Sequence, residues 1–346
     1  MTSYLERELR QQPAALARLI EQQRSFAERL GELFNRDDVQ YILIASRGSS
    51  SNAARYAQYL LGRAHRVPVA FATPSLFTLY EQPPRLDGAL VLGISQSGKS
   101  PDVVAVLDEA RRQGRPTIAL TNAPGSPLGR TADGVVKLEA GAEHAVAATK
   151  TYVNSLGAVA LLFAATTSDA TALAELERVP DRLALQVERS WDESRAIEAL
   201  GDVSGGTVVS RGINYCTSFE IALKIRELSG LLFESYSAAD LMHGPVAAIA
   251  PRWPVIAVAP SGPARDAMAK AVADVALRGA RTVVISDDTE LLAKGDVALP
   301  LVDGVPEWLT PLVAVVPGQL AALRLAQARG IDLDRPLGLS KVTLTR

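Results

Sequence analysis

The stretch YILIASRGSS, residues 41–50, decides the fold class. It is an apolar run that ends in Ser-Arg-Gly, and the helix-like segment NAARYAQYLLG follows it. The same order returns at residues 207–216, TVVSRGINYC, before the helix-like segment TSFEIALKIREL. Ser46 and Ser210, in the two Ser-Arg-Gly turns, lie 164 residues apart. Such a recurrence indicates that one structural unit occurs twice in the chain.

Two further pairs of segments keep almost the same spacing. LVLGISQSG matches VIAVAPSG, so that Ser97 and Ser261 are again 164 residues apart. GRPTIALTN, which begins at Gly114, matches GARTVVISD, which begins at Gly279, at a spacing of 165 residues. Three matches at one spacing favour two copies of a single fold over chance similarity.

Each copy alternates β-branched runs with segments of helical length. That alternation is typical of a parallel sheet covered by helices on both faces. We therefore expect an α/β protein with two tandem three-layer sandwiches, a helical leader and a short tail. The predicted boundaries are 1–35 for the leader, 36–185 and 198–330 for the sandwiches, and 331–346 for the tail.

Composition excludes several classes of function. The 346 residues carry a net charge of −2, with 48% hydrophobic and 21% charged residues, so no basic field would attract nucleic acid or an anionic membrane. The single cysteine, Cys216, cannot form an intrachain disulfide. The charged start MTSYLERELRQQ has no apolar signal core, and the apolar run at 156–165 is too short to span a bilayer. These features predict a cytoplasmic protein.

The segment GISQSGKS, residues 93–100, fits the phosphate-loop pattern of nucleotide triphosphatases. In the repeat, however, Gly93 aligns with Ala257 inside an apolar strand, so we expect the turn to begin only at Ser95. The remaining SQSGKS supplies hydroxyls at a predicted helix start, with Pro101 in its first turn, which suits a phosphate monoester. The second copy reads APSGPAR there, and we expect a single phosphate site, in the first copy.

Three charged residues lie at helical spacing after the second Ser-Arg-Gly turn. Glu220, Lys224 and Glu227 stand at i, i+4 and i+7, and therefore share one helix face. Such a stripe is often a solvated row of salt bridges. Because the helix follows a strand-end turn, its first turns should lie at the rim of the second sheet, and its apolar neighbours predict that part of it is buried. The alternative is therefore a partly buried catalytic group, with Glu227 as a proton-shuttling base.

His243 precedes Gly-Pro on a predicted loop, and an imidazole titrates near neutral pH, which suits acid–base chemistry, although a lone histidine is more often structural. No Cys/His cluster or pair of carboxylates at ligand spacing indicates a metal. No G-x-G-x-x-G follows a strand, so we expect no nucleotide cofactor.

In combination, the motifs SRGSS, SQSGKSPD, AEHAVAATKTYVNSL, EIALKIRE, HGP and LSKVT make the chain resemble the sugar isomerase (SIS) family over nearly its whole length. It is most similar to the isomerase half of glucosamine-6-phosphate synthase and to the related stand-alone glucosamine-6-phosphate deaminases. The resemblance implies two SIS domains. It places phosphate binding on Ser50, Ser95, Gln96, Ser97 and Ser100.

The same resemblance implies the remaining roles. The sugar-facing segment falls on residues 143–149, with Ala147 and Thr149 among the substrate-binding residues. The base falls on Glu227, with Lys224 and Glu220 beside it. The ring-opening histidine falls on His243, which in the family reaches into the partner subunit's site and so implies a homodimer. The C-terminal lysine falls on Lys341, where a basic residue would close over an anionic substrate.

Departures from the family narrow the expected activity. A synthase needs an N-terminal cysteine nucleophile, and the only cysteine here is Cys216. Asp240 stands where the family has a glutamate, and His144 differs from the synthases. We therefore expect deamination of glucosamine 6-phosphate to fructose 6-phosphate and ammonia. Alternatives are galactosamine 6-phosphate deamination, fructosamine-phosphate cleavage, another aldose–ketose reaction, or a sugar-phosphate sensor without turnover.

Overall fold

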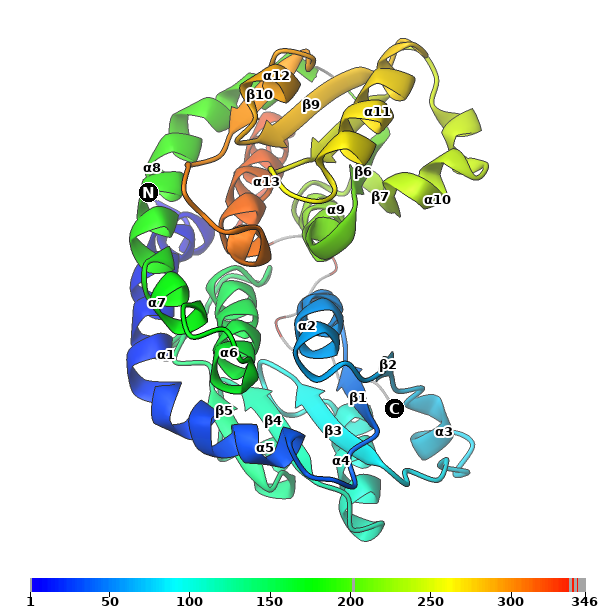
Figure 1. Cartoon of the computed structure of the whole chain (residues 1–346). Coiled ribbons are helices and arrows are strands. Elements are labelled where there is room, and N and C mark those ends of the chain that lie inside the picture. Colours follow the sequence, from blue (N-terminus) through cyan, green and yellow to red (C-terminus); the bar gives the residue numbers. More distant parts are fainter. Residues whose placement is uncertain (1, 201–202, 336–337, 339–340, 342–346) are drawn as a thin grey trace. The chain divides into compact units, whose positions relative to one another are not determined.

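The computed structural model describes residues 2–200, 203–335, 338 and 341 of the chain. These residues form two compact units, each with its own sheet (Figure 1). The first-sheet unit takes Gln11–Glu143, Lys150–Arg178 and, beyond residue 339, Lys341. The second-sheet unit takes the described parts of Met1–Arg10, His144–Thr149 and Val179–Leu339.

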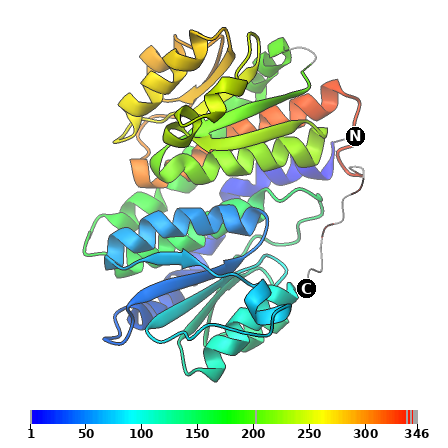
Figure 2. The same ribbon diagram turned by 90° about the vertical axis from the view of Figure 1, so that its right-hand side faces the viewer.

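The first sheet has five parallel strands in the order β2-β1-β3-β4-β5. They run side by side, blue to cyan, in Figures 1 and 2. The central strand, β3, is apolar and buried at every residue because helices cover both faces of a parallel sheet. The strands are β1 (Tyr41–Ser46), β2 (Val69–Phe71), β3 (Ala89–Ile94), β4 (Thr117–Thr121) and β5 (Gly134–Lys137).

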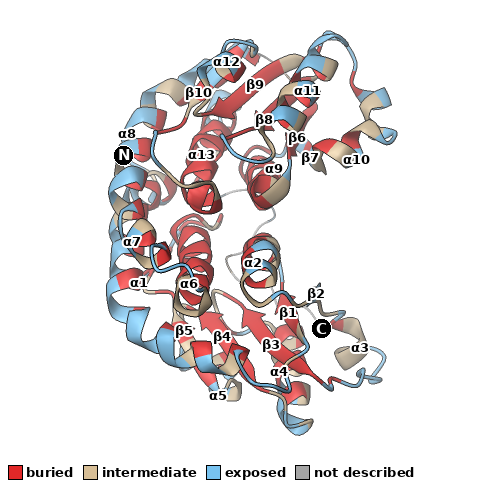
Figure 3. Ribbon diagram, in the orientation of Figure 1, coloured by how far each residue is buried: buried red, intermediate tan, exposed pale blue. Residues whose placement is uncertain are grey.

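The helices of this unit are α2 (Ser49–His65), α3 (Ser75–Thr78), α4 (Pro101–Arg112), α5 (Pro127–Thr131), α6 (Lys150–Thr166) and α7 (Ala172–Glu177), together with most of α1 (Tyr4–Phe34). The core helix α6 is buried along most of its length (Figure 3). Its Gly157 lets α1 approach closely, since a Cβ there would lie 2.4 Å from Leu16 Cδ1. The predicted leader helix is therefore present as α1.

The second sheet repeats the first in topology. Its five parallel strands have the order β10-β9-β8-β6-β7, which is the first sheet's order when each strand is numbered within its own copy. The strands are β6 (Gly205–Ser210), β7 (Leu232–Ser237), β8 (Pro254–Val258), β9 (Arg281–Ser286) and β10 (Val297–Pro300). The identical order confirms the internal repeat and the predicted α/β class.

The helices of the second-sheet unit are α8 (Val179–Glu193), η1 (Ser194–Leu200), η2 (Gly212–Asn214), α9 (Tyr215–Ser229), α10 (Ala238–Met242), η3 (Pro245–Ala248), α11 (Arg265–Ala276), α12 (Thr289–Leu292), η4 (Glu307–Leu309) and α13 (Thr310–Ala328). The stretch from Glu307 to Ala328 is apolar and long enough to cross a bilayer, yet its apolar window is fully buried in the fold, as in a core helix. Gly318 of α13 lets α9 pack closely, because a Cβ there would lie 2.2 Å from Ile221 Cγ1.

Candidate active site

Two serine-bearing turns meet at one edge of the first sheet. Strands β1 and β3 are neighbours, and their last residues, Ser46 and Ile94, are in register. The chain leaves β1 toward β2 on one side, whereas β3 begins the other half of the sheet. Ligands of open parallel sheets bind at such a switch point, at the carboxyl ends of the strands. Ser50 and the 95–100 turn are therefore brought to the position that this topology favours for a ligand.

The 95–100 turn is held by its own hydroxyl groups. Gly98 N donates to Ser95 Oγ at 3.2 Å, and Lys99 N donates to Ser97 Oγ at 3.3 Å. Ser95 Oγ and Ser100 Oγ are 3.5 Å apart. Gly98 has φ +61°, and a Cβ there would lie 1.9 Å from Ser126 Oγ, so only glycine fits. The turn thus presents several hydroxyls from a backbone of fixed shape.

Helix starts adjoin both turns. Helix α2 begins directly after Gly48, and α4 begins at Pro101 without a side-chain cap from Ser100. Backbone N–H groups at helix starts favour anions, so both turns add positive potential to the hydroxyls. Arg47, half exposed, is held by the buried carboxylate of Asp102, with Nε 2.6 Å from Oδ2. This pair gives Arg47 a structural role beside the turn.

The position of Gly93 argues against a nucleotide triphosphatase loop. Gly93 lies inside β3, paired with Ala45 and Ala119 of the neighbouring strands. A Cβ at this position would lie 2.8 Å from Leu107 Cδ1 in the core. The first glycine of the apparent motif is therefore a packing residue of the strand, as the repeat predicted.

The equivalent turn of the second copy has no room for a phosphate. The cavity beside Ser261 and Gly262 measures only about 10 Å³. Glu307 fills the space, since a Cβ on Gly262 would lie 2.6 Å from its Cγ. Ser261 N also donates to Asp287 Oδ1 at 2.6 Å. Two carboxylates therefore occupy the place where the first copy has hydroxyls.

Helix α9 carries a charged group that is largely buried. Glu220 and Lys224 are fully buried, and the side chain of Glu227 is 27% exposed. Lys224 Nζ lies 3.5 Å from Glu220 Oε1 and donates a hydrogen bond to Glu227 Oε2. The arrangement is not a solvated row of salt bridges. It is a buried ammonium between two carboxylates, one of which reaches solvent.

The start of α9 lies at the carboxyl rim of the second sheet, as expected for a helix that follows the Ser-Arg-Gly turn. Glu227 is in the last turn of this helix, which begins at Tyr215, about 18 Å along the helix axis. The helix leads the catalytic candidates away from the strand-end rim.

His243 lies at the end of α10, as predicted for a loop position. Its side chain is exposed, and its backbone N donates to Asp240 O at 3.1 Å. Asp240 forms a reciprocal cap with Ser237: Ser237 Oγ donates to Asp240 Oδ2 at 2.7 Å, and Asp240 N donates to Ser237 Oγ at 3.0 Å. The aspartate that replaces the family's glutamate therefore shapes the turn before His243.

Lys341 and Glu143 form an ion pair within the first-sheet unit. Lys341 Nζ lies 2.7 Å from Glu143 Oε2, and the Glu143 side chain is fully buried. Thr151 also donates to this carboxylate, from N at 3.1 Å and from Oγ1 at 2.6 Å. The C-terminal lysine is therefore anchored rather than solvated.

The sequence did not reveal how residues 144–149 are held. The buried carboxylate of Glu8 in α1 accepts hydrogen bonds from His144 N at 2.5 Å and from Ala145 N at 3.2 Å. Ala147 and Thr149, further along this segment, are buried. Glu8 sits in ERELRQQP, where a charged residue among charged neighbours gives no sign of burial. Only the fold brings it to this segment.

No cluster of three or more His, Cys, Asp or Glu that could hold a metal occurs in the described part of the chain. The five phosphate-binding candidates all lie in the first-sheet unit: Ser50, Ser95, Gln96, Ser97 and Ser100. Glu220, Lys224 and Glu227 come together in the second-sheet unit, which also contains His243. The chemistry available is thus anion binding by hydroxyls and N–H groups, and proton transfer by a lysine-supported carboxylate.

Curated relatives match nearly the whole chain. A glutamine–fructose-6-phosphate aminotransferase (isomerizing) from Methanothermobacter thermautotrophicus is 33% identical over 344 residues, and one from Pyrococcus horikoshii is 34% identical over 345 residues. Each alignment covers 98% of this chain and 57% of the relative, so the chain spans little more than half of these relatives' length.

Solved structures share the fold. A protein from Silicibacter pomeroyi, provisionally assigned as a phosphosugar isomerase, is 33% identical, with a TM-score of 0.86 and coverage of 95% of this chain and 99% of that one. The C-terminal domain of glucosamine-fructose-6-phosphate aminotransferase from Francisella tularensis is 26% identical, with a TM-score of 0.88 and coverage of 96% and 98%. The SIS domain model matches residues 37–165 and 207–329. The chain therefore belongs to the SIS domain family, whose fold it contains twice.

Proposed function

We propose that this SIS protein is an amino-sugar phosphate deaminase that converts glucosamine 6-phosphate and water to fructose 6-phosphate and ammonia. Its family supports an enzyme of the phosphosugar isomerase kind. The observation that carries the proposal is the α9 group, in which a partly exposed carboxylate is hydrogen-bonded to a buried lysine. That combination supplies a positioned base for proton transfer.

The reaction balances with this group, water and the substrate's own ammonium. In the open-chain substrate, Glu227 takes the proton from C2, the substrate's ammonium gives a proton to the oxygen on C1, and an enolamine forms. The carboxylic acid then returns the proton to C1, which leaves an imine at C2. Water adds to C2 and ammonia leaves, giving the ketose. Lys224 holds the carboxylate in place or stabilises the charge that develops on the C1 oxygen, and Glu220 positions Lys224.

The remaining roles concern binding and ring opening. In this proposal Ser50, Ser95, Gln96, Ser97 and Ser100 hold the phosphate, with helix-start N–H groups adding to them. Residues 143–149, with Ala147 and Thr149, face the sugar. His243 opens the pyranose ring, and Lys341 closes over the anionic substrate. We further propose a cytoplasmic homodimer in which His243 reaches the partner's site, with no metal or nucleotide cofactor.

A second candidate uses the same α9 group. An aldose–ketose isomerase needs the identical proton shuttle between C1 and C2 but releases no ammonia. The 4-epimer, galactosamine 6-phosphate, and a fructosamine phosphate are further substrates with the same chemistry. A sensor without turnover would have little use for a partly exposed carboxylate supported by a buried lysine, and we rank it last.

A substrate comparison tests the proposal. Purified protein is incubated separately with glucosamine 6-phosphate, galactosamine 6-phosphate and fructose 6-phosphate plus glutamine, and ammonia and hexose phosphates are quantified. We expect equal amounts of ammonia and fructose 6-phosphate from the first substrate alone. Ammonia from the galacto epimer only would move the assignment to that sugar. Glutamine-dependent formation of glucosamine 6-phosphate would overturn deamination as the activity.

A further inference from the structure

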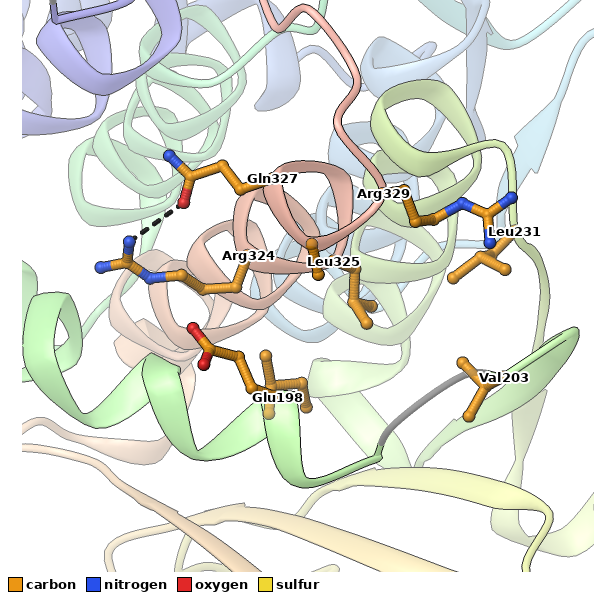
Figure 4. A pocket seen from close by; sticks show the side chains of 9 residues that line it. Glu198, Val203, Leu231, Arg324, Leu325, Gln327 and Arg329 are labelled. Carbon is orange, nitrogen blue, oxygen red and sulfur yellow. Dashed lines mark hydrogen bonds between the residues drawn. The ribbon is translucent and has the colours of Figure 1, made fainter.

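A cavity of about 570 Å³ lies in the second-sheet unit, at the end of α13 (Figure 4). Val203, just before β6, and Leu231, just before β7, line it. The cavity is therefore at the amino ends of these strands, the edge opposite to their ligand-favoured carboxyl ends. It contains none of the residues assigned above to substrate binding or catalysis.

The size and lining fit a small organic molecule. Ligand sites usually enclose about 300–1,000 Å³ and are mainly apolar, with a few polar groups that fix orientation. Ile197, Val203, Leu231 and Leu325 supply apolar walls here. The polar side chains of the lining are Gln327 and three charged residues, which favours a ligand with one charged end.

Arg324 is the most informative residue of the lining. It is only 9% exposed, and burial lowers the pKa of its guanidinium. Its hydrogen-bond acceptors are all neutral: Trp191 O at 2.7 Å, Gln327 Oε1 at 3.1 Å and Ser194 Oγ at 3.3 Å. Buried charges are normally paired with an opposite charge, and among the described residues Arg324 has no ion pair. Three of its five N–H groups donate to these described acceptors, which leaves two N–H groups for other acceptors.

The other charged groups of the cavity are Arg329 and Glu198. Figure 4 shows the Arg329 side chain beside Leu231, on the opposite side of the cavity from the Arg324 guanidinium. Glu198, Glu6 and Asp192 attract Arg324 electrostatically and Arg195 opposes it, but none of the three carboxylates forms an ion pair with it in the described structure. Among the lining residues themselves, two guanidinium groups stand against one carboxylate.

We propose that this cavity is a binding site for a small monoanion with an apolar body, such as an aromatic carboxylate or sulfonate, separate from the sugar-phosphate site. The apolar walls take the body, and the anionic group neutralises the side chain of Arg324 or Arg329. Glu198 opposes the anion and so limits affinity and selects against more highly charged ligands. The site does not depend on the deaminase activity proposed above.

A matched pair of fluorescent probes tests this site. 1-Anilinonaphthalene-8-sulfonate has the required anion, and N-phenyl-1-naphthylamine has the same ring system without it. Both are titrated into the full chain with saturating fructose 6-phosphate, the proposed product, present to occupy the sugar-phosphate site. We expect the sulfonate to bind at least about tenfold more tightly than the neutral probe, because it gains a charge-assisted contact. Equal affinity of the two probes would overturn the proposal.

Three variants test whether the sulfonate probe binds in this cavity. Arg329→Gln removes an exposed guanidinium without disturbing the core and should weaken sulfonate binding about fivefold, whereas Glu198→Gln should strengthen it about threefold. Ala328→Trp, at an exposed position of the lining, should block the cavity and abolish this binding. Arg278→Gln, an exposed arginine outside the lining, should change nothing. Unchanged binding in both Arg329→Gln and Ala328→Trp would contradict the assignment.

Discussion

The ammonium group of Lys224 donates a hydrogen bond to Glu227 Oε2, although Lys224 itself is fully buried and Glu227 reaches solvent. The lysine therefore fixes the carboxylate from the protein side and leaves its other face open. A base that moves a proton on a substrate needs this one-sided access.

Replacing Lys224 with methionine should destabilise the fold and abolish activity. The variant removes the cation that separates two carboxylates in a buried setting, and we expect a loss of about 3 kcal/mol in the free energy of unfolding. Lys270→Met is the control, because Lys270 pairs with Asp274 on the surface, where the expected loss is below about 0.5 kcal/mol. Urea unfolding measures both. Similar losses of unfolding free energy in the two variants would show that the buried Lys224 pair contributes no more than a surface pair.

Gly98→Ala should damage the serine turn. The new methyl group would collide with Ser126 Oγ at a residue whose φ is +61°, and we expect about 2 kcal/mol of destabilisation and a raised KM. Gly114→Ala is the matched control, since Gly114 has φ +68° but no atom within 4 Å of a Cβ. It should cost about 1 kcal/mol and leave KM unchanged. The account is wrong about this turn if KM responds equally in both variants.

Ser97→Ala should weaken phosphate recognition. Losing one hydroxyl donor to an anion should raise KM, and the inhibition constant of inorganic phosphate, about fivefold to tenfold. Ser261→Ala changes the equivalent serine of the second copy, where Glu307 fills the space, and should have no effect on either constant. An effect of Ser261→Ala as large as that of Ser97→Ala would place the phosphate elsewhere.

His65 predicts a pH dependence of stability. Its ring stacks on Phe34 with centroids 4.8 Å apart, and burial lowers the pKa of the imidazole from 6.5. The unfolded chain therefore takes up a proton at a higher pH than the folded chain, so this residue reduces stability as pH falls below 6.5.

His65→Phe keeps an aromatic ring but removes the titrating group. Thermal unfolding of both proteins is compared between about pH 7.5 and 5.5. The stability of the wild type should fall more steeply than that of the variant. Parallel curves would show that His65 titrates alike in the folded and unfolded chains.

Much of the fold was predictable because it depends on local patterns. The repeated apolar runs and Gly/Ser turns predicted both sheets, and helical spacing placed Glu220, Lys224 and Glu227 on one face. Their burial was not predictable, because i, i+4, i+7 spacing occurs equally on solvated helices. The strand-end turn placed the start of this helix at the rim, but Glu227 lies in the fourth turn, about 18 Å from that start along the helix axis.

Contacts between residues far apart in the sequence could not be predicted either. Glu8 meets His144 and Ala145 across more than 130 residues of sequence, and no motif connects them. Arg324 is a charged residue within an apolar stretch, and only the fold shows that it is buried and donates to Trp191 O. Such contacts depend on how elements pack, which residue spacing alone does not specify.

The most direct test of the central claim is ammonia release from glucosamine 6-phosphate by the wild type and by Glu227→Gln under identical conditions. The account predicts one ammonia per fructose 6-phosphate from the wild type. It predicts a rate at least about 10²-fold lower from the variant, because a carboxamide cannot carry the proton. The unfolding temperature should be similar for both, since Glu227 is partly exposed. Equal rates from the two proteins, or no ammonia from the wild type, would contradict the account.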